Sequence, residues 1–229
     1  MEDYYWDIIN KTKMGGYLTR KERELIDSFI EDNIITTCLD VACGSGRFSI
    51  PISQHGINVV AIDYDFVPLR KLKAKNGSEA SVQICRGDAN MLPFKKSSFD
   101  CIVSIEAFDY LDAKNYLKQC NELLKINGYL IFTSANNNSY KKFFHQILYK
   151  QKTFYRYNFH DIVFILEKVG FKVEKCTGYN WIPFKRNSNS ILIGFFEFLE
   201  KILLLGHFST ISPWVFFVAK KIEEPDEKC

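Results

Sequence analysis

The chain has 229 residues, of which 47% are hydrophobic and 25% charged, a composition that excludes a disordered or fibrous protein and suits a chain with a sizeable core. Its 30 basic and 27 acidic residues leave a formal charge of +3, too small to favour nucleic acid as a partner by itself. The seven cysteines form no C-x-x-C pair, and the acidic, aromatic N-terminus does not have the layout of a signal peptide. We therefore expect reduced cysteines and a cytoplasmic location.

Two helices are expected first, over residues 3–14 and 21–32, with Gly15 and Gly16 between them. Thr19, followed by Glu22 three positions later, has the form of a capping box for the second helix. We expect residues 1–34 to form a helical cap.

Residues 38–48 read CLDVACGSGRF, an apolar strand that breaks into glycines before a helix. Gly44 and Gly46 permit backbone angles and a close ligand approach that a β-carbon would block. Ligands of open α/β sheets bind at the carboxyl ends of strands, so this pattern predicts a small polar ligand on the glycines. The alternative is a tight turn without a ligand.

A second strand, 57–62, ends at Asp63, 17 positions after Gly46. Dinucleotide-type folds place an acid near this interval, where its carboxylate accepts two hydrogen bonds from ribose hydroxyls. The other interpretation, a helix N-cap, suits Asp65 better, ahead of a helix that reaches about residue 76.

The remaining elements alternate in the same way. A third strand, 81–85, leads to Gly87-Asp88-Ala89, and Asn127-Gly128 has the form of a left-handed cap that stops a helix. The other expected elements are strands at 98–105, 129–133, 172–177 and 214–220 and helices at 113–125 and 158–169. This order predicts a parallel α/β sheet with right-handed crossovers and helices on both faces.

Residues 191–205 are strongly apolar, but they are shorter than the roughly 20 residues that a membrane span requires. Four apolar residues share one helical face: Phe195, Phe198, Leu199 and Ile202. Glu197 and Lys201 lie on another face. We expect an amphipathic helix packed on a core; a helix in peripheral contact with a membrane surface is the alternative.

Five phrases of the sequence, in order, resemble the class I S-adenosylmethionine-dependent methyltransferases, in particular the small-molecule group that includes quinone-biosynthesis and sugar enzymes. They are LDVACGSGRF at 39–48, VVAIDYD at 59–65, GDANMLPF at 87–94, SFDCIVS at 98–104 and LLKINGYLIF at 123–132. The resemblance covers residues 36–134 and 158–221. It implies a Rossmann-like, seven-stranded, mostly parallel sheet, with the last strand antiparallel and inserted beside the fifth.

The resemblance further implies one methyltransferase domain over residues 1–229, with S-adenosyl-L-methionine as its cofactor. The segments 136–157 and 179–213 would be insertions that cover a substrate. The histidine of an E-x-x-E-H motif, found in many relatives after the fourth strand, is replaced here by Tyr110 in Glu106-Ala107-Phe108-Asp109-Tyr110.

By the same resemblance, Gly44 and Gly46 would pass beneath the methionine part of the cofactor, with Asp40 and Ala42 close by. Asp63 would hold the ribose hydroxyls.

The adenine end of the cofactor would contact three further residues. Tyr64 would pack on the ring, while Asp88 and the backbone amide of Ala89 would read its amino edge and ring nitrogen. Ile105, at the end of the fourth strand, would face the cofactor.

Three other functions compete with a small-molecule methyltransferase. An NAD-dependent oxidoreductase would use the same glycine loop and Asp63, but its third glycine is absent, since Ser49 stands there. A transfer RNA methyltransferase and a non-catalytic cofactor-binding protein are the others. Nucleic acid is disfavoured by the small net charge, and the oligomeric state stays open.

Methyl transfer to oxygen or nitrogen also removes a proton from the acceptor. The chemistry alone makes His145, His160, Asp109 and Tyr110 candidates, but no spacing marks them, and a structural role is the first interpretation of each. The four histidines, His55, His145, His160 and His207, form no ligand pair with an acid or cysteine, so no metal site is expected.

The acceptor pocket is expected around Tyr4, Tyr5 and Tyr17, the 108–110 loop and the two insertions. Ten basic residues against three acidic ones lie between 141 and 186. These cations are interpreted first as a solvated face and second as a patch for an anionic acceptor. Lys185 and Arg186 lie among aromatic residues, a combination that favours an apolar acceptor with an anionic group.

Overall fold

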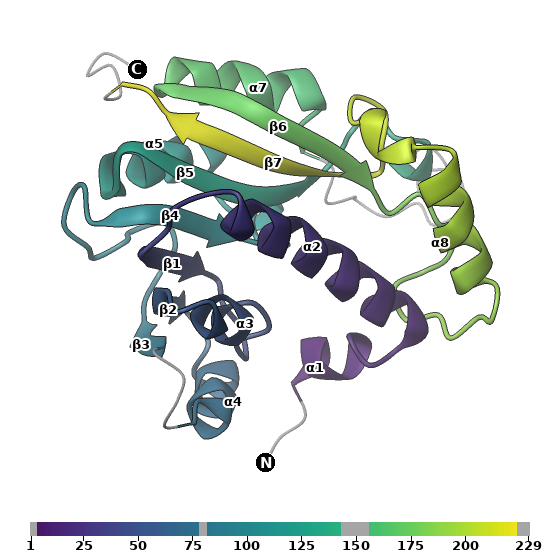
Figure 1. Cartoon of the computed structure of the whole chain (residues 1–229), viewed down its shortest axis with the longest axis horizontal. Helices are drawn as coiled ribbons and strands as arrows, with labels where there is room; N and C mark the ends of the chain where they lie inside the picture. The colour runs from purple at the N-terminus through teal and green to yellow at the C-terminus, as the bar shows by residue number, and fades with distance from the viewer. Residues whose placement is uncertain (1–3, 78–81, 143–155, 224–229) are drawn as a thin grey trace.

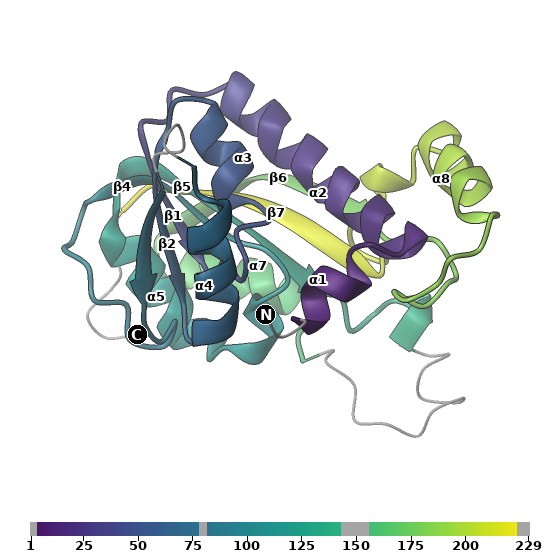
Figure 2. The same ribbon diagram turned by 90° about the horizontal axis from the view of Figure 1, so that it is seen from below.

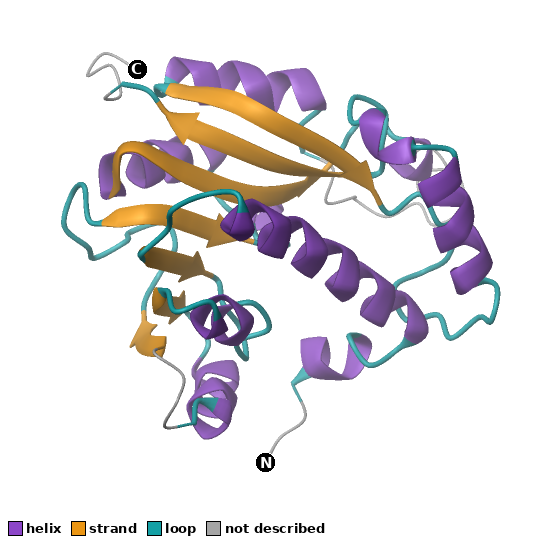
Figure 3. Cartoon of the chain, viewed as in Figure 1, coloured by secondary structure: helices purple, strands orange, loops and turns teal. Residues whose placement is uncertain are grey.

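The computed structural model describes residues 4–77, 82–142 and 156–223, and in this part of the chain seven strands form one sheet (Figures 1 and 3). The strands lie in the order β3-β2-β1-β4-β5-β7-β6. Their bounds are β1 Thr37–Val41, β2 Asn58–Asp63, β3 Val82–Arg86, β4 Phe99–Ser104, β5 Leu124–Ala135, β6 Phe171–Tyr179 and β7 Trp214–Lys221. Strands β1 to β5 pair in parallel, whereas β7 is antiparallel to both β5 and β6. The predicted mostly parallel Rossmann-like sheet, with its last strand beside the fifth, is confirmed.

Helices cover both faces of this sheet, as Figures 1 and 2 show. One core lies under α2 (Lys13–Glu31), α3 (Ser49–Gln54) and α4 (Phe66–Lys75). The other lies under α5 (Ala113–Leu123) and α7 (Phe159–Lys168). Alternate residues of each strand feed the two cores, so Cys38 packs on one face of β1 and Leu39 on the other.

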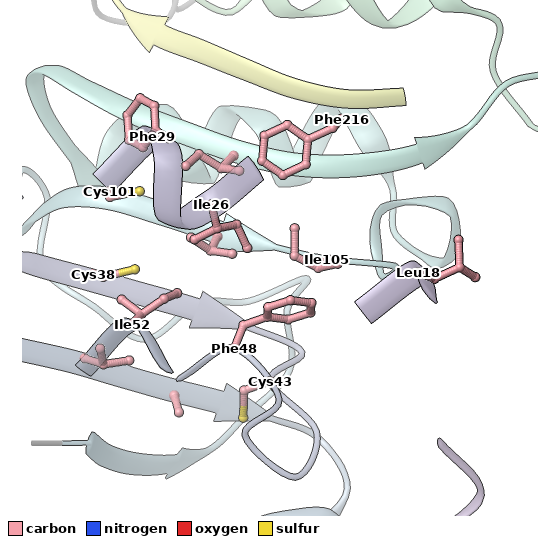
Figure 4. Packing of buried hydrophobic residues seen from close by; sticks show 14 of the residues in the cluster. Leu18, Ile26, Phe29, Cys38, Cys43, Phe48, Ile52, Cys101, Ile105 and Phe216 are labelled. Carbon is pink, nitrogen blue, oxygen red and sulfur yellow. The ribbon is translucent and has the colours of Figure 1, made fainter. Parts of the chain in front are cut away.

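Figure 4 shows the first core, where Ile26 and Phe29 of α2 lie over Cys38, Cys101 and Phe216 of the sheet. These strand positions are 2% exposed or less, which is the burial expected where a long amphipathic helix crosses a sheet. The six cysteines among the described residues are free thiols.

The N-terminal helices begin elsewhere than the sequence predicts. Helix α1 covers Tyr5–Ile9, and α2 begins at Lys13 because Thr12 caps it, accepting a 3.0 Å hydrogen bond from the amide of Gly15. A β-carbon on Gly15 would lie 2.2 Å from the carbonyl oxygen of Ile9, so glycine here lets α1 end against the first turn of α2. The predicted break at Gly15-Gly16 and the capping box at Thr19 are therefore wrong.

The predicted cap after the fifth helix is also misplaced. Helix α5 ends at Leu123 and β5 begins at Leu124, four residues before the predicted stop. Asn127 does have a left-handed φ of +65°, but it lies in an irregularity of β5, between the pairs Phe99–Leu124 and Cys101–Tyr129. The asparagine-glycine pair thus bends a strand.

Helix α8 (Ile193–Ile202) lies at the rim of the molecule, beside the first turns of α2 (Figures 1 and 2). The face expected on the core is instead exposed, at 56% for Phe195, 59% for Phe198 and 57% for Ile202. Ile193 and Glu200 are the buried residues of the helix, so the predicted orientation is wrong. No helix among the described residues is long and apolar enough to cross a membrane.

Candidate active site

A cavity of about 410 Å³ opens at the carboxyl ends of β1, β2 and β4, where the sequence places the glycine loop. Asp63 ends β2, while Ala42 and Ile105 directly follow β1 and β4; all three line the cavity. Its other wall comes from α1 and the residue before it, with Tyr4, Trp6 and Asp7. The cavity thus joins the strand ends to the N-terminal segment.

The loop after β1 runs through left-handed backbone at Ala42 (φ +57°), Gly44 (φ +55°) and Gly46 (φ +83°). A β-carbon at Gly46 would lie 2.3 Å from Leu72 Cδ1, so this glycine allows α4 to pack on the loop. Ala42 and Glu106 (φ +60°) are non-glycine residues in this costly region, and both line the cavity. Strain of this kind persists where surrounding structure holds it and clusters at ligand sites.

Asp63 connects the ends of three strands. Its Oδ2 accepts from the amide of Gly44 at 2.8 Å, and its Oδ1 accepts from the amide of Asp65 at 2.9 Å. The amide of Gly87, after β3, donates to the carbonyl of Asp63 at 3.0 Å. Asp65 caps α4 by accepting from the amide of Val67, so the N-cap interpretation of Asp65 is confirmed.

The structure separates the residues predicted for the adenine end from the cavity. Tyr64 is 71% exposed, with the guanidinium of Arg86 5.9 Å from its ring centre. Asp88 is exposed and accepts from the amide of Asn90 at 2.8 Å. Neither of them nor Ala89 lines the cavity: Tyr64 follows β2, the neighbour of β1, while Asp88 and Ala89 follow β3, one strand further out.

Asp40, Ala42, Gly44, Asp63 and Ile105 all line the cavity. Gly46 does not line it and packs against α4.

Asp40 is only 3% exposed and accepts a hydrogen bond from the hydroxyl of Ser49 at 2.5 Å. Burial raises the pKa of Asp40 to about 7, the charge of Asp63 adds to this rise, and the bond from Ser49 opposes it. Asp40 therefore gains or loses its charge as the pH changes around neutrality.

An ionic network that the sequence analysis missed adjoins the cavity, which its members Arg47 and Glu106 line. Arg47 donates to Glu106 Oε2 at 2.6 Å and lies 3.4 Å from Glu22 Oε2, a fully buried carboxylate of α2. Arg186 pairs with Glu106 and donates to Asn10 Oδ1 at 2.9 Å. The partners lie 59 and 80 residues apart in the chain, so no local pattern predicts them.

The N-terminal segment is fastened across the cavity. Asp7 of α1 accepts from the hydroxyl of Ser45 in the glycine loop at 2.5 Å and from Lys71 of α4 at 3.3 Å. The ring of Tyr4 lies over Gly44, with its hydroxyl oxygen 3.4 Å from where a β-carbon would stand. Of the three tyrosines expected in an acceptor pocket, Tyr4 lines the cavity, whereas Tyr5 is exposed and Tyr17 is buried against Glu200.

The candidate proton acceptors are dispersed. Tyr110 lines the cavity, and burial together with the charge of Asp109 raises its pKa, which disfavours the phenolate. Asp109 lies outside the cavity lining and accepts from the hydroxyl of Ser134 and the amide of Ala135 at the end of β5. His160 is exposed on α7 away from the cavity lining, and His145 is outside the described residues.

Of the two segments predicted to be insertions, 136–157 is described only in part, because residues 143–155 lie outside the described ranges, whereas 179–213 is described throughout. In the described portion, Lys141 donates to Asn180 Oδ1 at 2.7 Å, and burial lowers its pKa to about 7. Arg186 reaches the edge of the site through Glu106, whereas Lys185 is exposed. Among the described residues, no group of three or more histidine, cysteine or acidic side chains could hold a metal ion.

Comparison with known proteins adds sequence relatives to this geometry. Residues 39–132 match a methyltransferase domain family. An uncharacterised protein of Methanocaldococcus jannaschii is 28% identical over 97% of this chain and 91% of that protein. A demethylmenaquinone methyltransferase of Paenarthrobacter aurescens is 26% identical over 58% of this chain, which spans about half (51%) of that enzyme.

Solved structures of methyltransferases share the fold. Magnesium protoporphyrin IX methyltransferase of Synechocystis, with bound SAH (S-adenosylhomocysteine), superimposes with a TM-score of 0.68 at 14% identity. The match covers 96% of this chain and 89% of that one.

Proposed function

We propose that this chain, which belongs to the class I S-adenosylmethionine-dependent methyltransferases, transfers a methyl group from S-adenosylmethionine to a small-molecule acceptor. The observation that carries the proposal is the position of Asp63. Its carboxylate lies at the end of β2, is hydrogen-bonded to the amide of Gly44, and faces the same cavity as Asp40 and Ile105. This is the arrangement expected for a ribose diol above a glycine loop.

The charges of the cavity fit this cofactor, which carries a sulfonium and an ammonium cation and one carboxylate. Four carboxyl groups line the cavity, those of Asp7, Asp40, Asp63 and Glu106, whereas Arg47 is its lining cation. Glu106 is paired with Arg47 and Arg186 and Asp7 with Lys71, so the cations of the ligand would meet Asp63 and, where it is ionised, Asp40. Arg47, which is paired with Glu106, is the lining cation that the ligand carboxylate would meet.

The cofactor supplies an activated methyl group on a good leaving group, so the protein has mainly to align the acceptor and exclude water. Alignment alone can supply about 7–11 kcal/mol of the barrier. In this chain, the glycine loop and Asp63 orient the ligand, while Tyr4, Trp6 and α1 cover the cavity. Tyr110 is the described candidate placed to meet an acceptor proton, although its raised pKa disfavours a role as base.

We further propose an apolar acceptor that carries an anionic group. Trp6, Phe48 and Leu111 line the cavity beside Arg47, and Arg186 lies behind them with its guanidinium 5.1 Å from the centre of the Trp6 ring. The quinone named for one relative supports an apolar acceptor. The proposal covers acceptors methylated at oxygen, nitrogen or carbon.

The competing functions differ in what they bind. An NAD-dependent oxidoreductase needs close helix packing at position 49, where Ser49 is buried and donates to Asp40. A transfer RNA methyltransferase would require a basic surface, against which the net charge of +3 argues. A non-catalytic binding protein would take the cofactor without turning it over.

Titration calorimetry of the full chain with S-adenosylmethionine, S-adenosylhomocysteine and NAD tests the cofactor. Micromolar binding of the first two without NAD is expected, and NAD binding without a response to S-adenosylhomocysteine would overturn the proposal. Release of S-adenosylhomocysteine is then measured with quinones, prenylated or phosphorylated lipids, sugars and transfer RNA. Release with transfer RNA alone would contradict a small-molecule acceptor.

The position of the acceptor is tested by the double substitution of Lys185 and Arg186 to alanine. The acceptor KM is expected to rise while affinity for S-adenosylhomocysteine stays within about twofold, a change below 0.5 kcal/mol. The double substitution Lys172 and Lys175 to alanine, on exposed positions of β6, is the matched control. Lower cofactor affinity at an unchanged acceptor KM would place the acceptor elsewhere.

A further inference from the structure

Helix α8 has two opposite faces, and the more apolar one points to solvent. Ile193, Phe196 and Glu200 form an inner stripe at intervals of three and four residues. Phe195, Phe198 and Ile202 repeat the same intervals two positions later. Because each residue turns a helix by about 100°, the second stripe lies about 200° away from the first.

Polar contacts and one ring contact fix this orientation. Glu200 is 6% exposed and accepts from the hydroxyl of Tyr17, and Phe196 packs edge-on against Phe184 with ring centres 5.7 Å apart. Glu197 pairs with Arg20 of α2 at 2.8 Å. The helix is therefore held with a carboxylate inward and two phenylalanines outward, the reverse of an ordinary amphipathic surface helix.

The outward residues form part of a larger apolar surface. Beyond Phe195, Phe198 and Ile202, the segment that follows exposes Leu204 (62%), Phe208 (51%) and Ile211 (52%). Isolated exposed apolar side chains are ordinary, but a run of them from one short segment marks an interaction site. We call Phe195, Phe198 and Ile202 the outer α8 face.

The charges around the outer α8 face are compatible with an anionic partner. Residues 181–213 contain two acids, Glu197 and Glu200, and the contacts above engage both. Lys201 is exposed within α8. Lys13 is exposed as well, and its amide donates to Asn189 Oδ1, just before the apolar segment.

From this juxtaposition of an outward apolar helix face, engaged acids and exposed lysines, we propose that the outer α8 face docks on a bilayer containing anionic lipid. The helix has 10 residues and a length of about 15 Å, so it lies in the plane of the interface. The aromatic and aliphatic residues enter the acyl boundary, while Lys201 and Lys13 meet lipid phosphates.

The segment that precedes α8 links the outer α8 face to the cavity. The carbonyl of Arg186 accepts from Thr12, at the start of α2, while its guanidinium pairs with Glu106 on the cavity wall. An apolar acceptor dissolved in a bilayer is then collected where the enzyme docks. This link between docking and acceptor collection rests on the proposed function, whereas the docking itself can be measured without any methyl transfer.

The test is co-sedimentation of the full chain with vesicles of phosphatidylcholine alone or with about one third phosphatidylglycerol. The wild-type protein is expected to sediment with the anionic vesicles. The triple substitution Phe195→Ser, Phe198→Ser and Ile202→Ser is expected to lower the partition coefficient at least about tenfold. The matched control replaces three exposed apolar residues elsewhere, Ile34, Ile126 and Phe164, by serine and should partition like wild type.

A second variant separates charge from apolar contact. Lys201→Glu should weaken binding to the anionic vesicles and leave binding to phosphatidylcholine unchanged. All variants should keep the wild-type affinity for S-adenosylhomocysteine, a measurement that also shows that they fold.

Several outcomes would overturn the proposal: no vesicle binding by wild type, equal binding by the triple variant, or an equal loss in the matched control. A wild-type dimer that the triple variant abolishes, without vesicle binding, would assign the face to a second copy of the chain. Face-dependent vesicle binding by a protein that binds no S-adenosylhomocysteine would support the docking surface and contradict the proposed function.

Discussion

The amide of Gly44 donates a 2.8 Å hydrogen bond to Asp63 Oδ2, which joins the glycine loop after β1 to the end of β2. Because the other oxygen of the same carboxylate accepts from Asp65, this side chain holds the loop in shape and faces the cavity at once. The shape of the glycine loop and the lining of the cavity are therefore coupled at Asp63.

Replacing Asp63 by alanine is expected to weaken binding of S-adenosylhomocysteine by about 1.5–3 kcal/mol, since a charged acceptor is lost. Asp63→Asn retains one carbonyl acceptor and should lose less. Calorimetry measures both, and Asp65→Ala is the control, because Asp65 caps α4 without lining the cavity. Unchanged affinity in Asp63→Ala would refute the ribose role.

Asp40 makes stability depend on pH. Burial raises its pKa from the ordinary value of 3.8 to about 7, so between these pH values the unfolded chain has released a proton that the folded chain retains. The free energy of unfolding attributable to Asp40 therefore falls as pH rises from about 4 to about 7. Asp109, whose pKa burial raises to about 6, acts in the same direction.

Asp40→Asn is therefore expected to reduce the loss of Tm between pH 5 and pH 8, because one of these two protons no longer titrates. Calorimetric melting at both pH values measures the difference from wild type. Identical pH slopes in the two proteins would mean that Asp40 is ionised in the folded state at acidic pH.

Arg47→Met should destabilise the fold by about 3–5 kcal/mol, because it leaves the buried carboxylate of Glu22 without its cation. Urea unfolding followed by circular dichroism measures the change. The control is Arg23→Ala, which breaks the exposed i,i+4 pair with Asp27 and should cost less than about 1 kcal/mol. Similar losses for the two substitutions would show that the network around Glu106 stabilises the fold no more than an exposed ion pair does.

Ala42→Gly should be neutral or stabilising by up to about 1 kcal/mol, because glycine relieves the left-handed backbone at φ +57°. Ala107→Gly is the control, since Ala107 also lines the cavity but has a φ of −118°. The Ala107→Gly protein should be destabilised by roughly 0.5–1 kcal/mol. Equal destabilisation of both proteins in urea would show that the loop carries no strain at residue 42.

The sequence predicts what local patterns encode. Apolar runs that alternate with helical segments identify the strands. A carboxylate at the end of such a run identifies Asp63 as a candidate site residue. Local patterns do not predict the network of Arg47, Glu106 and Arg186, because its members meet only after the sheet and the segment 179–213 have folded.

Helix α8 shows a different limit. Its periodicity predicts a helix with two faces, but which face turns inward depends on a partner distant in the chain. The hydroxyl of Tyr17 binds Glu200 and the guanidinium of Arg20 binds Glu197, and these contacts turn the side of α8 that carries both acids toward α2. The start of α2 is predicted wrongly for a related reason, because glycine at position 15 is required by its contact with Ile9 and does not mark a break between helices.

The position of β7 between β5 and β6 has a consequence for synthesis on the ribosome. Strand β6 pairs with β7 and with no other strand in the described sheet, yet β7 is the later of the two in the chain. While residues 214–221 are still being made, β5 keeps an open edge and β6 has no strand to join. A nascent chain paused at that stage exposes unpaired strand edges, the template on which intermolecular pairing begins.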